Sequence, residues 1–292
     1  MVKSRGIKKS MDERIFKLIT VVIVILFSLA CLLPFLRVIS EAFSSDVYVA
    51  SGEIVLWPKG FTLKHIQFIL DTYQFSRGMY LSLVSTIVFT LVAMLLTCTL
   101  AYPLSRSYLP KGRALMFFVI FTMLFNGGIV PTYLVVKQLN LLDTFWALII
   151  PQAISQFNVI VLVNAFRGVP KEMEESAAIE GAGQFTILTR IMIPLCKPTL
   201  TALLLFYAVG RWNSWFDVVM YINDRSLFTL PVIIRDIMQQ GLTTLNYSIS
   251  SPPPTMAVQS AAVIFSIFPI ILLYPFLQKY FVKGMTLGGV KG

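Results

Sequence analysis

The chain has 292 residues, of which 57% are hydrophobic and 13% are charged, and its formal net charge is +10. Soluble globular domains carry about 25% charged residues, so the composition excludes an ordinary soluble domain and indicates a protein embedded in lipid. Basic residues of membrane proteins chiefly mark the cytoplasmic side, and the positive charge therefore does not indicate a nucleic-acid partner.

Six hydrophobic segments are long enough to cross a membrane as helices. The first has no charge from Leu18 to Leu36, and its apolar sequence continues past Cys31, which favours a membrane span over a cleaved signal peptide. The fifth apolar run is short, and we expect its helix to continue through Arg211 to about Tyr221. The predicted spans are about 15–38, 80–104, 114–136, 144–166, 199–221 and 255–277.

The distribution of basic residues predicts the orientation of these spans. Sixteen of the twenty-four Lys and Arg residues fall on the side that holds both termini and the loop 167–197. The richer side is cytoplasmic, so both termini are expected in the cytoplasm. Residues 1–292 then form a single all-α integral membrane domain with external loops at 40–77 and 222–254, the first with room for a short helix in 56–70.

Candidate catalytic and metal-binding side chains are few. The three cysteines, Cys31, Cys98 and Cys196, have no spacing typical of a metal site or a disulfide framework. His65 is the only histidine and has no nearby partner in the sequence. A histidine-based catalytic or metal centre is therefore not expected.

The predicted cytoplasmic loop contains an acidic, small-residue stretch, KEMEESAAIEGAG, at 171–183. Four of the fourteen acidic residues of the chain lie in it. On a helix, Glu174, Ala177, Ala178 and Gly181 share one face that is nearly bare of side chains. Such a face suits a docking surface for a cytoplasmic partner, although a charge run also fits a solvated loop.

A turn and a second short helix are expected after this stretch. Gly181 and Gly183 permit a sharp turn. Phe185, Leu188 and Ile191 then follow at helical spacing, and Pro194 and Pro198 end the segment and begin the fifth span. The loop is therefore expected to form a helix–turn–helix along the inner membrane face.

The spacing of this loop resembles the "EAA" loop of ATP-binding-cassette (ABC) importer permeases. The matching residues are Glu175-Ser176-Ala177, then Gly181, then Ile191-Met192-Ile193-Pro194, with Ser176 and Ile193 as mild departures. The segments RWNSWFDV and YPFLQKYFVKGMTLGGVKG resemble carbohydrate permeases of the maltose-permease type. The segment NGGIVPTYLVVKQLNLLDTFWALIIP is similar to their LplC/YtcP-like subgroup.

The resemblance implies an ABC type I importer permease fold in a bacterial cell membrane. It also implies that the loop is a coupling helix held in a cleft of an ATPase subunit, and that the tail 284–292 is a second contact, unless that tail is merely a frayed terminus. Its implied partners are a second permease subunit, two ABC ATPases and an extracytoplasmic solute-binding protein. The implied ATPase-coupling residues are Glu174, Glu175, Ala177, Ala178, Gly181 and Pro194.

The chain lacks the phosphate-binding motif G-x-x-x-x-G-K-[ST]. It is therefore expected to be neither an enzyme nor a cofactor-binding subunit, with ATP and Mg bound by the partner ATPases.

Charged residues within spans usually face the protein interior or water, and two occur near the end of the fifth span. Aromatic faces combined with hydrogen-bonding groups suit a sugar. Alternatively, the two tryptophans anchor the span at the interface and the charges lie at the headgroups. The possible substrate-pathway residues are Arg211, Trp212, Asn213, Trp215 and Asp217.

The leading hypothesis is thus the membrane subunit of an ATP-driven carbohydrate importer. Import of another solute, such as an amino acid, a peptide or phosphate, stays open within the same fold. An ion-driven secondary transporter would require inverted repeats and midplane acids, and the sequence has no clear repeat. A membrane enzyme is disfavoured because no nucleophile or metal motif is present.

Overall fold

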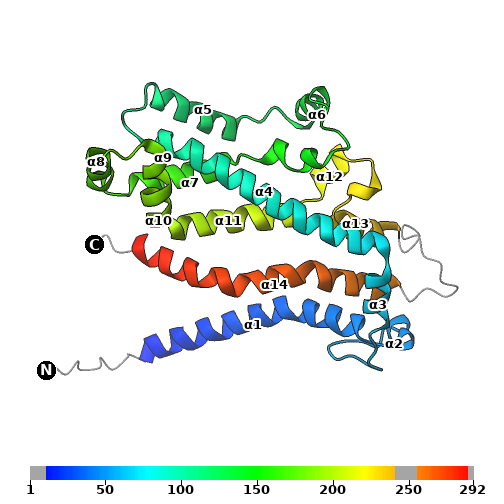
Figure 1. Cartoon of the computed structure of the whole chain (residues 1–292). Helices are drawn as coiled ribbons and strands as arrows, with labels where there is room; N and C mark the ends of the chain where they lie inside the picture. Colours follow the sequence, from blue (N-terminus) through cyan, green and yellow to red (C-terminus); the bar gives the residue numbers. More distant parts are fainter. Residues whose placement is uncertain (1–10, 241–254, 289–292) are drawn as a thin grey trace. The chain divides into compact units, whose positions relative to one another are not determined.

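The computed structural model describes residues 11–240 and 255–288, and every regular element in these ranges is helical (Figure 1). The α-helices are α1 (Met11–Ala42), α2 (Asp46–Ala50), α3 (Lys64–Asp71), α4 (Tyr73–Ser105), α5 (Gly112–Leu124), α6 (Ile129–Gln138), α7 (Gln156–Arg167), α8 (Lys171–Ile179), α9 (Gln184–Ile187), α10 (Ile193–Leu195), α11 (Lys197–Trp212), α12 (Phe216–Tyr221), α13 (Leu230–Gln240) and α14 (Thr255–Gly288). Short 3-10 helices are η1 (Phe145–Leu148), η2 (Ile150–Gln152) and η4 (Arg225–Leu227), and η3 (Leu188–Met192) is a π-helix.

The chain divides into two compact units. The first comprises residues 1–71 and 247–265 and holds α1, α2, α3 and the beginning of α14. Glu41 of α1 accepts a hydrogen bond of 2.9 Å from Ser260 of α14. Val49, Ile54 and Ala257 form a small buried cluster beside this contact. Polar and apolar contacts thus tie the start of α14 to the segment after α1.

His65 in α3 lies in a polar network of the first unit. It is fully buried, with Nε2 2.7 Å from Oδ1 of Asp46 and Nδ1 3.2 Å from the carbonyl oxygen of Ala42. Lys64 also donates to Asp46, at 2.8 Å. The sequence places no partner near His65, but the chain folds back and brings Asp46 to it from nineteen positions earlier.

The second unit comprises residues 72–246 and 266–292, and its centre is the packing of α4 against α7 and α11 (Figure 1). One buried cluster joins these helices with α9 and the π-helix, and includes Ala101, Leu162, Phe166, Ile187 and Leu203. A second cluster lies nearer the other end of α4 and includes Phe89, Leu148, Ile149, Tyr207 and Val218. Both cores therefore share α4 and α11, whereas α7 contributes only to the first.

Two described helices are long and apolar enough to cross a membrane unbroken, Ile15–Ala42 and Tyr73–Ser105. The number rises to as many as five if each bent helix pair forms one span. These pairs are Gly112–Leu124 with Ile129–Gln138, Phe145–Gln152 with Gln156–Arg167, and Gln184–Leu195 with Lys197–Trp212, bent by 114°, 53° and 87°. A shorter apolar helix, Met256–Leu272, lies within α14.

Three of the six segments predicted as continuous helices are broken. In 114–136 the break contains Gly128, whose φ is +90° and whose N–H donates to the side chain of Asn126 at 2.9 Å. In 144–166, Pro151 lies in η2 and Ser155 caps the start of α7. In 199–221, α11 ends at Trp212 and α12 begins at Phe216. Local hydrogen bonds of polar side chains, which hydropathy does not record, accompany these breaks.

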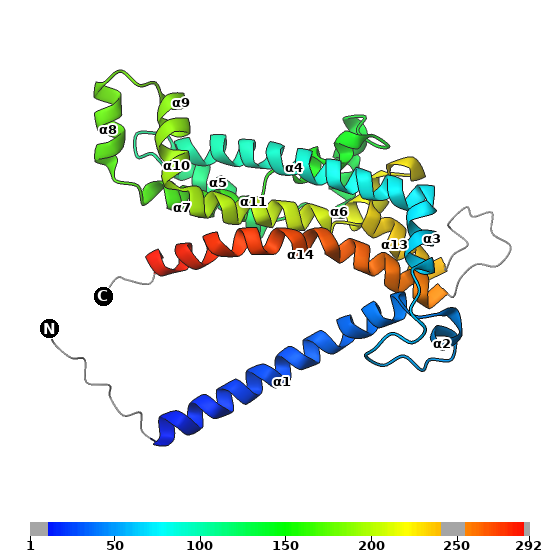
Figure 2. The same ribbon diagram turned by 60° about the horizontal axis from the view of Figure 1, so that its bottom comes forward.

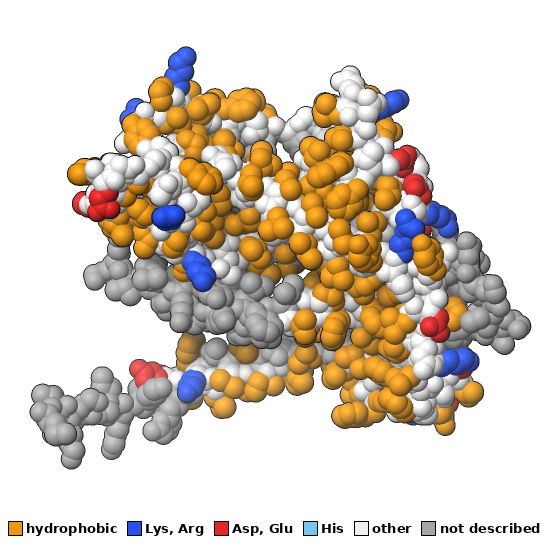
Figure 3. Space-filling view, viewed as in Figure 1, with side chains coloured by type: hydrophobic (Ala, Val, Ile, Leu, Met, Phe, Trp, Pro, Cys, Tyr) orange, Lys and Arg blue, Asp and Glu red, His pale blue; other side chains and the backbone are white. Residues whose placement is uncertain are grey.

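The surface agrees with a lipid environment. Figure 3 shows hydrophobic side chains over the middle of the face that α4 crosses, with charged side chains nearer its two ends. In α4 itself, Leu91 and Leu95 are 64% and 63% exposed. A face of this kind is stable next to hydrocarbon rather than water.

The segment after α8 packs differently from its sequence pattern. Phe185, predicted on the buried face of a short amphipathic helix, is 75% exposed, whereas Ile187, Leu188 and Met192 are buried. Of the three residues predicted at helical spacing, Leu188 is buried, Ile191 is partly buried and Phe185 is exposed.

Candidate functional site

The acidic stretch forms an elbow, which we define as residues 171–187, at one end of α4 and α11 (Figure 2). Glu172 and Glu174 lie in the first turn of α8, where the helix dipole favours negative charge. Gly181 ends the helix with φ +84°. Its N–H donates to the carbonyl of Ala178 at 3.0 Å, and the following N–H closes a second bond of 2.9 Å. This left-handed turn reverses the chain into α9.

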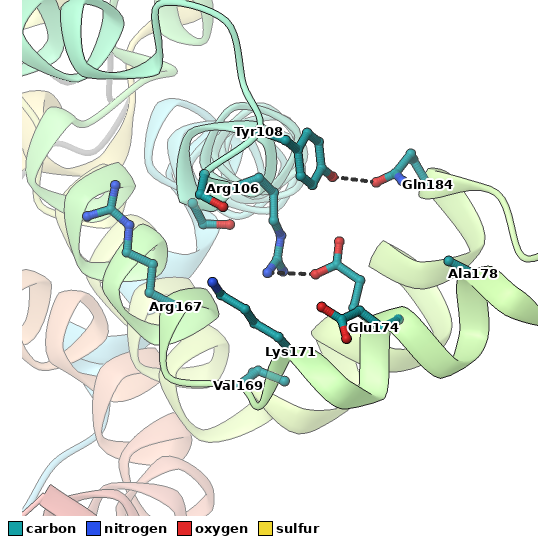
Figure 4. Close-up of a pocket in the computed structure, with 11 residues that line it drawn as sticks. Arg106, Tyr108, Arg167, Val169, Lys171, Glu174, Ala178 and Gln184 are labelled. Carbon is teal, nitrogen blue, oxygen red and sulfur yellow. Dashed lines mark hydrogen bonds and ion pairs between the residues drawn. The ribbon is translucent and has the colours of Figure 1, made fainter.

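The elbow is tied to the end of α4 by a polar network (Figure 4). Arg106 Nη1 lies 2.7 Å from Oε2 of Glu174, and the two side chains are only 7% and 14% exposed. The Tyr102 hydroxyl lies 3.1 Å from Oε1 of Glu174 and 2.7 Å from Oε1 of Gln184, to which Tyr108 also donates. The Arg106 guanidinium lies 4.9 Å from the centre of the Tyr102 ring. The network fixes both helices of the elbow.

A cavity of about 540 Å³ lies between the elbow and the ends of α4 and α7. Arg106, Arg167 and Lys171 line it together with Glu174 and Glu175. Arg167 lies across the cavity from Gln184 (Figure 4) and donates to the carbonyl of Leu104 at 3.2 Å. The walls of this cavity therefore carry both positive and negative side chains.

The outward side of the elbow presents apolar side chains. Ile179 is 88% exposed and Phe185 is 75% exposed. Both side chains are thus available for contact with a partner. Sequence reasoning concentrated on the small and acidic residues and missed these two, although their isolation within a polar loop was a usable signal.

The predicted coupling residues separate into two groups. Glu175, Ala178 and Gly181 are exposed, as is Pro194 in α10. Glu174 instead pairs with Arg106, and Ala177 packs on the larger buried cluster. The sequence therefore overestimated the bare face, because half of it is turned toward the protein itself. The anchoring residues Tyr102, Arg106 and Gln184 carried no recognisable sequence signal.

The predicted pathway residues do not form one cluster. Arg211 and Asp217 form a buried ion pair whose side chains are 1% and 4% exposed, and Ser214 also donates to Asp217. The other three are engaged elsewhere. Trp212 donates to the carbonyl of Ser266 at 2.8 Å, Asn213 donates to that of Val209 at 3.0 Å, and Trp215 lies 4.1 Å from the Arg235 guanidinium.

Two cavities flank this ion pair. Arg211 lines one of about 490 Å³, with Asn158 and Tyr207 among its walls. Asp217 lines another, of about 220 Å³, and Gln152 lines both. Nothing in the sequence brings Gln152 and Asn158 next to Arg211, so sequence reasoning did not group them with it.

The model of the family described as "Binding-protein-dependent transport system inner membrane component" matches residues 100–287. This range includes both the elbow and the Arg211–Asp217 pair. The chain therefore belongs to this family of membrane subunits of binding-protein-dependent transporters.

Individual relatives agree with this assignment. The protein LplC of Bacillus subtilis (strain 168) is 42% identical, over 89% of this chain and 90% of that protein. The polygalacturonan/rhamnogalacturonan transport system permease protein YtcP of the same organism is 39% identical, over 97% of this chain and 100% of that protein. A chain from a bacterial ABC transporter that imports the acidic polysaccharide alginate superposes with a TM-score of 0.87 at 28% identity, over 94% of this chain and 100% of that chain.

The broad predictions of class are thereby confirmed. The protein is an all-helical permease subunit of an ABC importer and a multi-pass protein of the cell membrane, and such a subunit is not itself the ATPase.

Proposed function

We propose that this chain forms half of the membrane pathway of an ATP-driven carbohydrate importer, and that the outward side of the elbow is its contact with an ATPase. The carbohydrate cargo is supported by relatives such as the permease for polygalacturonan and rhamnogalacturonan. The alternatives, another solute in the same fold or an ion-driven transporter, lack a supporting observation.

The anchored elbow carries the proposal. A segment that transmits force between two subunits must be held rigidly by its own subunit and must bind the other subunit. The Arg106–Glu174 pair holds the elbow to α4, and Ile179 and Phe185 project from it. Burial of such side chains contributes about 1.5–3 kcal/mol each, which favours contact of the elbow with a partner.

The proposed assembly contains a second permease subunit, two ABC ATPases that bind ATP and Mg, and an extracytoplasmic solute-binding protein. This chain would contribute six spans, with both termini and the loop 167–197 in the cytoplasm. The second predicted ATPase contact, 284–292, lies outside the residues whose side chains are described, as does much of the loop 222–254.

Neighbouring alanines offer a matched test of the ATPase contact. Ala178→Cys places a thiol on the exposed side of α8, and Ala177→Cys places one toward the buried cluster. Both are made with the exposed Cys31 changed to serine. In the assembled transporter, a short bifunctional thiol–amine reagent should link A178C to an ATPase subunit and leave A177C unlinked. An active complex in which A178C reaches no cytoplasmic subunit contradicts the proposal.

A further inference from the structure

The Arg211 guanidinium is paired on one edge only. Its Nη1 donates to Asp217, but Nε and Nη2 are buried and have no hydrogen-bond partner within the described part of the chain. Both carboxylate oxygens of Asp217 are meanwhile engaged, one by Arg211 and the other by Ser214. Buried donors are normally satisfied, and the two unpaired N–H groups of Arg211 are therefore available to an acceptor.

The unpartnered edge has a specific shape. Nε and Nη2 carry parallel N–H groups on one side of the planar guanidinium. This fork matches the two oxygens of a carboxylate, which accepts both hydrogen bonds at once. A hydroxyl group offers a single oxygen and fills only half of the fork.

The cavity that Arg211 lines has features that fit a sugar acid. It measures about 490 Å³, and Arg211 is the only residue with a formal charge along its described walls. The buried amide residue Asn158 and the exposed ring of Phe157 also line it. A cationic fork, an amide and an aromatic face are what a pyranose ring with a carboxylate requires. Asp217 lines the smaller cavity and not this one.

We infer that the Arg211 edge of this cavity is a binding site for the carboxylate of a uronic acid residue in the transported oligosaccharide. The inference rests on the proposed function and narrows its cargo to acidic sugars. Asp217 and Ser214 hold the guanidinium in place, and the solute completes its hydrogen bonds during passage.

The test measures protection of a thiol beside Arg211. Gly210 lines the same cavity, and an added side chain there meets no atom within 4 Å. Gly210→Cys, with Cys31→Ser, is labelled by an uncharged maleimide in the purified complex of permeases and ATPases, without the solute-binding protein. The probes are trigalacturonate, its fully methyl-esterified form and maltotriose, which share a similar size, and only the first is charged.

Trigalacturonate should protect the thiol at a concentration at least about tenfold lower than its methyl ester or maltotriose does. Arg211→Lys keeps the charge and loses the fork, and should reduce this preference to about twofold to threefold. The double variant R211Q/D217N, which leaves no unpaired charge, should abolish the preference. Assembly of each variant is verified by size-exclusion chromatography.

Equal protection by the acid and its ester, or an unchanged preference in R211Q/D217N, overturns the inference. Equal protection by all three sugars leaves the proposed carbohydrate pathway standing and removes only the acid site. If none of the sugars protects the thiol or stimulates the ATPase of the intact complex, the carbohydrate function fails as well.

Discussion

Glu174 in α8 and Arg106 at the end of α4 form an ion pair with an Nη1–Oε2 distance of 2.7 Å, buried beneath the elbow. The pair joins a residue that the sequence assigned to a partner contact with one that the sequence did not single out. Its position makes the elbow an extension of the longest helix of the second unit, so the elbow and α4 should move as one piece.

Breaking this pair should uncouple ATP hydrolysis from transport. Removal of one partner of a buried pair costs about 3–5 kcal/mol, and the slight exposure of Glu174 places E174Q near the lower end. We expect the ratio of solute imported to ATP hydrolysed to fall at least about tenfold, since each tenfold effect corresponds to only about 1.4 kcal/mol. The measurement is uptake and hydrolysis in the same proteoliposomes.

Glu172→Gln is the matched control, because Glu172 is exposed in the same turn. The swapped variant E174R/R106E should recover part of the coupling. An E174Q transporter with the coupling ratio of the unaltered protein would remove the anchor from the mechanism.

Ile179 should be a principal contact of the ATPase. Ile179→Ser removes apolar area that a partner would bury, and a loss of about 1.5–3 kcal/mol corresponds to at least about a tenfold weaker association. The permease itself should unfold at an unchanged temperature, since Ile179 packs little within the chain. Association is measured by titrating ATPase subunits onto permeases in nanodiscs, with Ile179→Val as a control that should bind normally.

Substitutions at two glycines of the elbow separate the effect of backbone strain from the effect of side-chain size. Gly181 has φ +84°, whereas Gly183 has φ −72°, and an added methyl group meets no atom within 4 Å at either one. A left-handed conformation costs an L-residue about 1–2 kcal/mol. Gly181→Ala should therefore weaken hydrogen-exchange protection of the elbow and lower coupling, and Gly181→Asn should do so less. Gly183→Ala should resemble the unaltered protein, and equal effects at both positions would contradict this explanation.

Asp46 should make the first unit sensitive to acid. The hydrogen bond from Lys64, and secondarily that from His65, holds the pKa of Asp46 below its usual value. A carboxyl group with a lowered pKa in the folded state stabilises the fold above its unfolded-state pKa and loses this contribution as the pH falls through the folded-state pKa. Amide protection in α3 should therefore fall below about pH 4.

Asp46→Asn provides the comparison for this pH effect. The variant should show weaker hydrogen-exchange protection of α3 at neutral pH than the unaltered protein. Because it lacks the Asp46 carboxyl group, its protection should not fall further between pH 5 and pH 3 through titration at this position. The measurement is hydrogen exchange corrected for the intrinsic rate at each pH. If the variant and the unaltered protein lose protection in parallel, Asp46 is not the titrating group.

Composition and hydropathy predicted the membrane class, because long apolar runs are read directly from the chain. They did not predict the breaks at Gly128 and Ser155, where local hydrogen bonds interrupt the helices. The spacing around Glu175 predicted the elbow, but not which side of it faces the protein. That depends on Arg106, which lies far away in the sequence and whose role appears only when the chain folds.

The π-helix at Leu188–Met192 has a consequence for the elbow. A π turn holds one residue more than an α turn, and one residue corresponds to about 100° of rotation around a helix axis. Loss of Thr189, for example, would restore a regular helix and require the elbow to turn by about that angle relative to α10, which would break the Arg106–Glu174 pair. Ile179 and Phe185 would then point in a new direction while every side chain of the elbow stayed the same. The orientation of the elbow thus depends on the number of residues in the π-helix that follows it. A single deletion there could separate the elbow from its partner without changing any residue on the elbow's surface.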